Sequence, residues 1–326
     1  MHGAVYERNG PARDVLRVIE LPRPEPGPGD VRVKVAASGI NPSDVKRRAG
    51  AVAGASLPWP RQIPHQDGAG LIDAVGDGGP DERLGERVWV YQAAFERPSG
   101  TAAEYVCVPA HRAVPLPADV EFEQGAGLGV PYITAYASLF DADPLAGRCV
   151  LVTGGAGAVG NAAVQLASWA GARVVATVSS AEKAGLARAA GAHETVDYRV
   201  EDSAAALASA VPDGIDRVVD VALGTNIASY AGHLRPGAQV VAYSREGQPA
   251  PLPVRPLMEA NIRLRFLLVY HLPEHVLADA CTSITAALQA GALTPLPDRR
   301  FPLADIVSAH EAVEAGVTGK VLLVPA

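Results

Sequence analysis

The sequence predicts an α/β protein with a β-rich first third and a doubly wound parallel sheet in the middle of the chain. Short alternating strands between Gly- and Pro-rich turns predict a barrel-like β domain at the start. From about Glu121 onward, helical and strand patterns alternate, which is typical of a parallel sheet covered by helices. A glycine-rich turn between a strand and a helix is the third observation behind this prediction.

Strand patterns come first in the chain. Val31–Val35 alternates strictly between apolar and polar residues, as a half-buried strand does, and it follows a Pro- and Gly-rich loop at 22–29. The strands expected in this third are Leu16–Leu21, Val31–Val35, Gly70–Gly76, Arg87–Tyr91 and Ala102–Val108.

The pattern in the middle of the chain predicts a βαβ series. A helix is expected over Gln124–Leu139, before the first strand of the series. The expected strands are Cys149–Val152, 173–178, Glu194–Val196, Arg217–Val221 and Gln239–Tyr243, with helices at 159–170 and 181–190. The tail adds a helix over Leu303–Glu314 and a strand over Lys320–Val324. Sequential strands joined by helices form a parallel sheet with right-handed crossovers.

The glycine-rich turn carries the strongest functional signal. Gly155, Gly157 and Gly160 fit G-x-G-x-x-G, and Gly154 fits a looser spacing of the same kind. Apolar residues from 159 to 170 then recur on one helical face. Such glycines allow a tight turn and close approach of the backbone to a pyrophosphate, which the free N–H groups of the helix can bind. A plain Gly-rich turn is the alternative, but the flanking strand and helix favour a dinucleotide site.

The end of the next strand indicates which dinucleotide binds. NAD sites usually place a carboxylate there to bind the ribose hydroxyls, and this chain has Val178 instead. Ser179 and Ser180 follow, with Lys183 one helical turn further on. Hydroxyls and a cation suit a 2′-phosphate, so the pattern predicts NADPH. A solvated helix lysine is the alternative interpretation of Lys183.

Composition narrows the possible partners. The chain has 326 residues, of which 48% are hydrophobic and 19% charged, and a net charge of −7 without a basic run. These values disfavour nucleic acid and anionic membranes as partners and leave a small-molecule substrate. The start of the chain lacks an apolar signal core, and no apolar stretch is long enough to span a membrane. Three scattered cysteines fit a cytoplasmic protein with reduced thiols.

Several short motifs, in this order, resemble one known family over nearly the whole length. They are Gly39–Asp44, Ile63–Gly70, Leu84–Val88, Gly100–Tyr105, Gly129–Tyr136, Thr177–Lys183, His310–Ala312 and Thr318–Leu322. With them the chain resembles the zinc-free medium-chain dehydrogenase/reductases, specifically the zeta-crystallin-like NADPH:quinone oxidoreductases.

The resemblance implies the domain organisation. A GroES-like substrate domain is expected over 1–122 and 267–326, and a Rossmann NADPH-binding domain over 123–266, with the nicotinamide and substrate meeting in a cleft between them. It also implies a homodimer that pairs Rossmann edge strands. The apolar run Arg265–Tyr270 is the candidate edge strand, because an exposed apolar edge needs a partner.

Site residues also follow from the resemblance. Asn41 and Thr134 would lie by the nicotinamide and its ribose, and together with Asp44 they are the candidate catalytic residues. Asp44 also fits an ordinary helix start after Pro42. The expected cofactor-binding set is Asn41, Thr134, Gly154, Gly157, Ala158, Val159, Gly160, Ser179, Ser180, Lys183, Tyr198, Tyr243, Ser244, Leu268 and Lys320.

Departures from the family cluster on the expected substrate side. Val52 stands where many members have a tyrosine, His65 replaces a glycine, and the loop from Tyr91 to Ser99 is longer than in many relatives. We therefore expect Val52, His65 and Tyr91 to edge the substrate pocket.

The expected function is an NADPH-dependent reductase that passes hydride to a quinone. An enone or enoyl thioester reductase is the alternative, and a structural or RNA-binding role is the non-enzyme alternative. No metal is expected, because Asn41 and Gln66 stand where the related alcohol dehydrogenases have their first zinc-ligating Cys and His.

Overall fold

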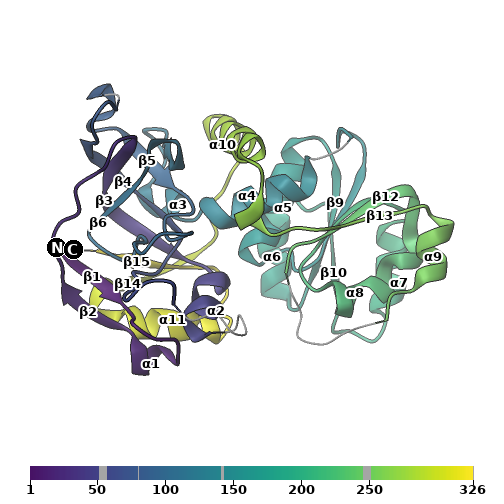
Figure 1. The fold of residues 1–326 in the computed structure, drawn as a ribbon. Helices are drawn as coiled ribbons and strands as arrows, with labels where there is room; N and C mark the ends of the chain where they lie inside the picture. The colour runs from purple at the N-terminus through teal and green to yellow at the C-terminus, as the bar shows by residue number, and fades with distance from the viewer. Residues whose placement is uncertain (51–56, 80, 141–142, 245–250, 326) are drawn as a thin grey trace. The chain divides into compact units, whose positions relative to one another are not determined.

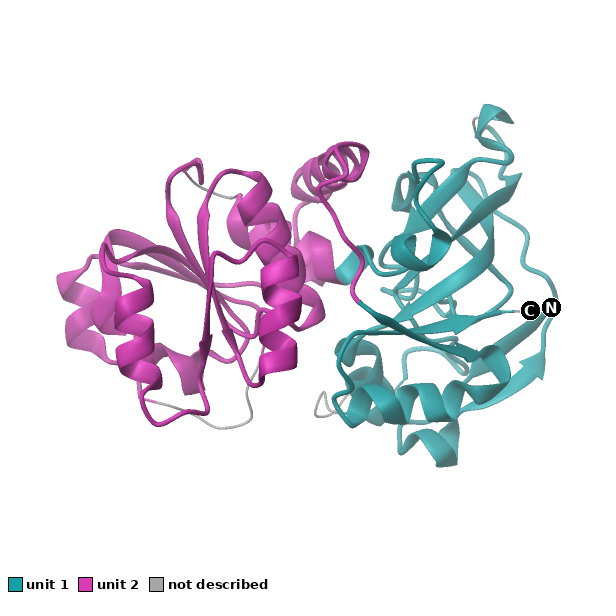
Figure 2. Cartoon of the chain, turned by 180° about the vertical axis from the view of Figure 1, so that it is seen from behind, with its two compact units in different colours: residues 1–130, 297–326 teal, residues 131–296 magenta. Residues whose placement is uncertain are grey.

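The computed structural model describes residues 1–50, 57–79, 81–140, 143–244 and 251–325. They form two compact units, residues 1–130 with 297–326 and residues 131–296 (Figures 1 and 2). The units differ from the expected domains mainly at the second boundary, which was expected at 266/267. Gln165 bonds both the N–H and the C=O of Thr294, at 2.6 and 3.0 Å, and so holds the segment before residue 297 in the second unit.

The second unit contains a six-stranded, all-parallel sheet in the order β10-β9-β8-β11-β12-β13. Its strands are β8 (Cys149–Val152), β9 (Arg173–Val178), β10 (Glu194–Asp197), β11 (Ile215–Asp220), β12 (Leu234–Ala242) and β13 (Arg263–Phe266). The order reverses between β8 and β11, which makes the carboxyl ends of these two strands the switch point where open α/β sheets bind ligands.

Helices cover both faces of this sheet (Figure 1). The helices of this unit are α4 (Gly129–Leu139), α5 (Ala158–Trp169), α6 (Ala181–Ala189), α7 (Ser203–Ala210), α8 (Leu223–Tyr230), α9 (Val254–Glu259) and α10 (Glu274–Gln289). Leu207 of α7, Ile227 of α8 and Leu257 of α9 share one buried cluster with Leu151 and Val218 of the central strands. Each fully buried aliphatic side chain of this kind contributes roughly 1.5–3 kcal/mol to folding. The predicted Rossmann fold is confirmed.

The first unit contains a seven-stranded sheet in the order β14-β15-β3-β4-β5-β7, with β6 also paired to β3. β1 and β2 form a separate two-stranded antiparallel sheet. The strands are β1 (His2–Val5), β2 (Arg17–Glu20), β3 (Asp30–Ile40), β4 (Asp67–Val75), β5 (Arg87–Val90), β6 (Tyr105–Pro109), β7 (Ala113–Pro115), β14 (Asp298–Pro302) and β15 (Lys320–Val324). Its helices are α1 (Ala12–Val15), α2 (Pro42–Ala49), α3 (Phe122–Gly125) and α11 (Ile306–Glu314). The predicted GroES-like β fold built from both chain ends is confirmed.

Two expected elements differ in the structure. The helix predicted over Gln124–Leu139 is two helices, α3 and α4, because the chain breaks to bring Gly129 against Asp67: a Cβ at Gly129 would lie 2.2 Å from Asp67 Oδ1. The edge strand predicted over Arg265–Tyr270 is β13, which ends at Phe266, and a 3-10 turn takes up Val269–His271.

Candidate active site

The glycine-rich turn adopts the close packing that its sequence predicts. Gly154 has φ +69°, a left-handed conformation that favours glycine, and Gly157 caps α5. A Cβ at Gly160 would lie 2.2 Å from the carbonyl oxygen of Gly154. The first turn of α5, from Ala158 to Gly160, therefore lies directly against the end of β8 at the switch point, where its N–H groups can bind a pyrophosphate.

Asp220, which the sequence analysis did not single out, pins this turn from the neighbouring strand. It is fully buried at the end of β11 and accepts hydrogen bonds from Thr153 Oγ1 (3.0 Å) and Tyr230 OH (2.6 Å). Thr153 Oγ1 in turn accepts from Val221 N at 3.0 Å. Asn226 Nδ2 and the backbone N–H of Ala222 also donate to Asp220 Oδ1, at 2.8 and 2.7 Å. The carboxylate thus joins both sides of the switch point and fixes where the turn begins.

The residues predicted for the 2′-phosphate lie together at the end of β9. Lys183 Nζ donates to Ser179 Oγ at 3.1 Å, and Ser180 Oγ caps α6 by accepting from Lys183 N at 3.2 Å. Tyr198 N bonds Val178 O at 3.1 Å, so Tyr198, which is 55% exposed, follows β10 alongside this group. The carboxylate of Asp197, in register with Val178, is occupied by the N–H of Arg199 at 2.9 Å.

The other predicted cofactor residues of this unit follow the same sheet edge. Tyr243 comes directly after β12 and bonds Asp220 O through its N–H at 3.2 Å, with Ser244 next in the chain. Leu268, 54% exposed, follows β13. Since all six strands are parallel, these segments and the glycine-rich turn leave the sheet at one edge. Thr134 is buried on α4.

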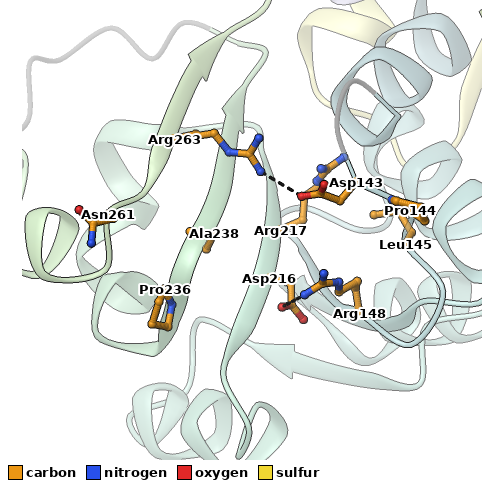
Figure 3. Close-up of a pocket in the computed structure, with 11 residues that line it drawn as sticks. Asp143, Pro144, Leu145, Arg148, Asp216, Arg217, Pro236, Ala238, Asn261 and Arg263 are labelled. Atoms are coloured by element: carbon orange, nitrogen blue, oxygen red, sulfur yellow. Dashed lines mark hydrogen bonds and ion pairs between the residues drawn. The ribbon is translucent and has the colours of Figure 1, made fainter.

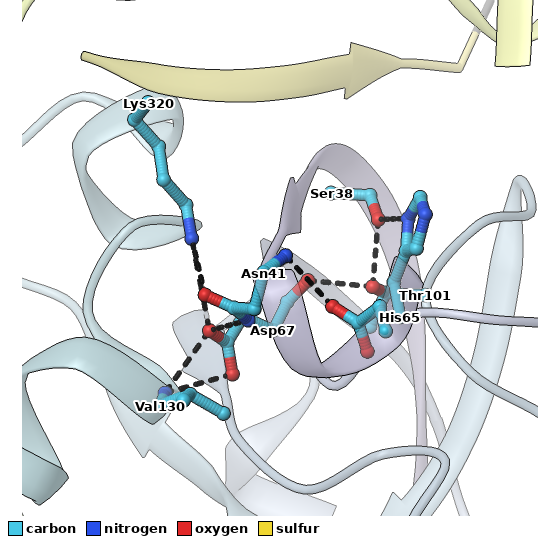
Figure 4. Close-up of polar contacts among 8 residues, drawn as sticks. Ser38, Asn41, His65, Asp67, Thr101, Val130 and Lys320 are labelled. Carbon is cyan, nitrogen blue, oxygen red and sulfur yellow. Dashed lines mark hydrogen bonds and ion pairs between the residues drawn. The ribbon is translucent and has the colours of Figure 1, made fainter. Parts of the chain in front are cut away.

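In the first unit, three of the predicted site residues, Asn41, Asp44 and Lys320, form one buried polar cluster with Asp67 (Figure 4). Lys320 Nζ donates to Asn41 Oδ1 at 2.8 Å, and Asn41 Nδ2 donates to Asp67 Oδ2 at 2.7 Å. Asp44 Oδ2 accepts from the backbone N–H of Asn41 at 2.8 Å, at the start of α2. Val130 N, in the first turn of α4, donates to both oxygens of Asp67 at 3.0 Å. Asp67 is the member that the sequence analysis missed.

Burial shifts the protonation equilibria of this cluster. Burial, together with the nearby Asp67 carboxylate, raises the pKa of Asp44 to about 7. Burial also raises the pKa of Asp67 to about 6, although Lys320 and the amide of Asn41 oppose that shift. The pKa of Lys320 is lowered by burial, against the attraction of the two carboxylates. The cluster therefore holds groups that can exchange protons near neutral pH.

His65, expected at the substrate pocket, is fully buried and stacks on His310, with ring centroids 5.1 Å apart. Thr101 Oγ1 donates to the Asp67 carbonyl at 2.5 Å, so Ser38 Oγ must donate to Thr101, at 2.7 Å. Ser38 then accepts from His65 Nδ1–H at 2.9 Å, and His65 Nε2 accepts from His310 Nε2–H, also at 2.9 Å. His310 Nδ1 is left as a buried acceptor without a partner in the described chain.

His65 and Tyr91, which are expected to edge the substrate pocket, are both buried. Both ring nitrogens of His65 are hydrogen-bonded within the protein, and Tyr91 is 3% exposed. The pocket-edge role of both residues stays a prediction. His65 also has φ +78°, a backbone conformation that favours glycine and agrees with the glycine that the family resemblance implies at this position. Val52 lies outside the described residues.

The histidine pair predicts a measurable acid sensitivity. Burial lowers the pKa of His310 to about 3, and that of His65 well below its ordinary value of 6.5. The folded state therefore keeps neutral rings, while the unfolded chain takes up protons below about pH 6.5. The contribution of neutral His310 to the free energy of unfolding is therefore fully present above about pH 6.5. It is lost as the pH falls toward 3, by about 1.4 kcal/mol per pH unit.

Asp44 and Asp67 have raised pKa values, so they make the folded state more stable as the pH falls and oppose the effect of His310. The prediction is therefore made for the difference in free energy of unfolding between the wild type and a variant at His310. His310→Gln keeps an N–H donor toward His65 but cannot be protonated. Between pH 7.5 and 5.5, the advantage of the wild type over this variant in free energy of unfolding should shrink by about 1–1.5 kcal/mol. Urea unfolding at both pH values measures it, and a difference that does not change with pH contradicts the prediction.

The residues present do not fit a zinc site. Among the residues that the structure describes, no three His, Cys, Asp or Glu side chains are grouped to hold a metal ion. Asn41 is engaged by Lys320 and Asp67, and both ring nitrogens of His65 are hydrogen-bonded. Absence of a metal stays a prediction.

A separate hollow of about 430 Å³ lies at the amino ends of β8, β11, β12 and β13, at the opposite sheet edge from the glycine-rich turn (Figure 3). Arg148 pairs with Asp216 at 3.2 Å and Arg263 with Asp143 at 3.4 Å, while Arg217 donates to the carbonyl of Leu139. Two of its three guanidinium groups thus already face carboxylates, which leaves little charge for an anionic cofactor.

Two family models match the chain. One, described as an alcohol dehydrogenase GroES-like domain, matches residues 27–118, and the other, described as a zinc-binding dehydrogenase, matches residues 158–284. Together with the GroES-like and Rossmann units, these matches define a medium-chain dehydrogenase/reductase.

Proteins that are similar to this chain over nearly its whole length identify the family within this class. The quinone oxidoreductase of Lama guanicoe is 31% identical over 325 residues, covering 98% of this chain and 96% of that protein. A mycobacterial protein solved in complex with NADPH is 30% identical, with a TM-score of 0.83 over 100% of both chains. Escherichia coli quinone oxidoreductase, also solved with NADPH, is 25% identical with a TM-score of 0.84 over 100% of both chains. This chain belongs to the quinone oxidoreductase family.

Within the described residues, every helix falls short of the length and apolar character needed to cross a bilayer.

Proposed function

We propose that this protein is an NADPH-dependent reductase of quinones. The observation that carries the cofactor assignment is the group at the end of β9, where Lys183 and Ser179 are hydrogen-bonded and Val178 replaces the usual carboxylate. Two similar proteins solved with NADPH support it, as does the name quinone oxidoreductase among the relatives.

The chain's own residues bind and orient the cofactor. N–H groups at the start of α5 would hold the pyrophosphate, and Ser179, Lys183 and Tyr198 would hold the 2′-phosphate. The family resemblance implies that Asn41 and Thr134 would each lie by the nicotinamide. When bound, NADPH supplies the hydride, and the protein contributes placement and exclusion of water.

The two candidate substrate classes differ in the proton donor that their reduction requires. A quinone needs no strong protein acid, because solvent can protonate the quinol oxygen. An enone or enoyl thioester instead needs a proton on carbon, and the titratable Asp44 and Lys320 keep this alternative open.

NADPH oxidation against a panel of quinones, enones and enoyl thioesters tests the proposal. Quinones should give the highest kcat/KM. An enone or enoyl thioester preferred over every quinone would replace the proposed substrate class, and no turnover with any acceptor would reject reductase activity.

Filter binding of RNA at low salt tests the non-enzyme alternative, which the net charge of −7 disfavours.

We also propose a homodimer formed through β13. Among the described strands β13 pairs only with β12, so its outer edge offers unpaired N–H and C=O groups. Phe266 is 71% exposed and Leu268 54% exposed beside that edge. An exposed apolar edge strand is an aggregation hazard unless another strand covers it.

Light scattering should therefore report a dimer at micromolar concentration, and Phe266→Glu should shift it toward monomer. A monomeric wild type would contradict the dimer.

The three free cysteines support a reducing, cytoplasmic location for this protein, which fractionation of the host cells can test.

A further inference from the structure

The amide of Asn41 is held between two opposite charges, and this fixes which way it points. Lys320 can only donate a hydrogen bond as an ammonium, so the atom 2.8 Å from its Nζ must be the amide oxygen. The Asp67 carboxylate can only accept, so the atom 2.7 Å from its Oδ2 must be the amide nitrogen. A reversed amide would place N–H against ammonium and oxygen against carboxylate.

Sheet register explains why these three residues meet. Val321 of β15 pairs with Ile40 of β3, so Lys320 lies next to Asn41, and Asp67 of β4 pairs with Gly39. The stem of Lys320 passes close to Gly39, where a Cβ would lie 3.1 Å from Lys320 Cε. Lys320, Asn41 and Asp67 are 7%, 2% and 0% exposed, so water competes little for these bonds.

The arrangement leaves one hydrogen of Asn41 Nδ2 without an acceptor in the described part of the chain, while its oxygen is already engaged by Lys320. Asn41 can therefore offer a further partner an N–H group more readily than an oxygen. The ammonium behind the amide oxygen also polarises the amide, which strengthens the remaining N–H as a donor.

We propose that Lys320 and Asp67 are positioning residues that hold Asn41 as a hydrogen-bond donor, so that the group it contacts in the reactive complex is a carbonyl oxygen. This inference rests on the proposed function, which places Asn41 by the nicotinamide and substrate. A donor in this place holds a carbonyl acceptor in line for hydride and stabilises the negative charge that builds on its oxygen. Lys320 then acts through Asn41 and need not touch the cofactor.

A double-mutant cycle tests whether Lys320 acts through Asn41. Lys320→Met keeps the aliphatic stem and removes the donor, and we expect kcat/KM for the quinone to fall about tenfold in the wild-type background. In the Asn41→Ala background the same change should cost less than about twofold, because no amide remains to orient. Equal losses in both backgrounds would overturn the proposal.

Matched variants separate positioning from folding. Lys320→Arg restores a donor and should recover most of the activity, whereas Lys34→Met, the same change at an exposed lysine of β3, should have no effect. NADPH affinity should change less than about twofold in all of them, since the phosphate contacts come from the other unit. If Lys320→Met does not fold, Lys320→Gln, whose amide satisfies either orientation of Asn41, replaces it, with the same cycle and outcomes.

A readout without turnover separates this inference from the proposed function. In protein labelled with ¹⁵N-asparagine, the side-chain NH₂ signals of Asn41 are identified by their loss in Asn41→Ala. At pH 8, where Asp67 is ionised, Lys320→Met should shift or double these signals, and Lys34→Met should leave them in place. Unchanged signals in Lys320→Met would overturn the inference. Shifted signals in a protein without quinone turnover would support the positioning while rejecting the proposed function.

Discussion

Lys183→Ala should weaken NADPH binding by about 1.5–3 kcal/mol and leave NADH binding nearly unchanged, because only NADPH carries the 2′-phosphate that we propose this ammonium binds. Lys183 is half-buried and already held in place by Ser179 Oγ at 3.1 Å, so little side-chain freedom is lost when the phosphate arrives. Isothermal titration with each cofactor measures the effect.

Arg188→Ala is the matched control for this prediction. Arg188 is an exposed cation on the same helix, α6, but it lies in the last turn and bonds Thr195 Oγ1 at 2.6 Å. Its removal should change the affinity for either cofactor by less than about 0.5 kcal/mol. If Lys183→Ala weakens NADPH and NADH binding equally, the 2′-phosphate site has been assigned to the wrong residues.

Gly160→Ala should disrupt the pyrophosphate turn. The added Cβ would lie 2.2 Å from the carbonyl oxygen of Gly154, and neither backbone segment can move without shifting the end of β8 or the start of α5. Overpacking of this kind costs about 1–3 kcal/mol of stability. Displaced N–H groups should also lower the affinity for NADPH and NADH alike, by roughly tenfold or more.

Gly185→Ala provides the control, because Gly185 lies in α6 with nothing within 4 Å of its added Cβ. Alanine is the better helix former, so this variant should gain about 0.5–1 kcal/mol of stability and bind NADPH as the wild type does. Thermal unfolding and cofactor titration of both variants decide the matter. Normal NADPH binding by Gly160→Ala would place the pyrophosphate elsewhere.

The parts of the fold that could be predicted from sequence are those written in local patterns. The strand Cys149–Val152, the glycine-rich turn and the helix after it are consecutive, so periodicity and glycine spacing were enough to place them. The same holds for Ser180 and Lys183, which a helix start brings into one turn.

What sequence reasoning missed depends on pairing between distant segments. Asp67 reaches Asn41 and Lys320 only through the register of β4 and β15 on β3. His65 meets His310, 245 residues further along the chain, in a buried contact that no local pattern could predict. Asp220 lies next to the end of the strand predicted over Arg217–Val221 and is the last residue of β11. A polar residue at the end of a strand beside the switch point was the signal that could have identified it.

A comparison of kcat/KM for NADPH with kcat/KM for NADH, with one p-quinone as acceptor under identical conditions, tests both the cofactor and the substrate class. We expect quinone-dependent oxidation of both cofactors, with NADPH preferred by at least about tenfold, the ratio expected from one charged phosphate contact. A preference for NADH, or no quinone-dependent oxidation of either cofactor, would contradict it.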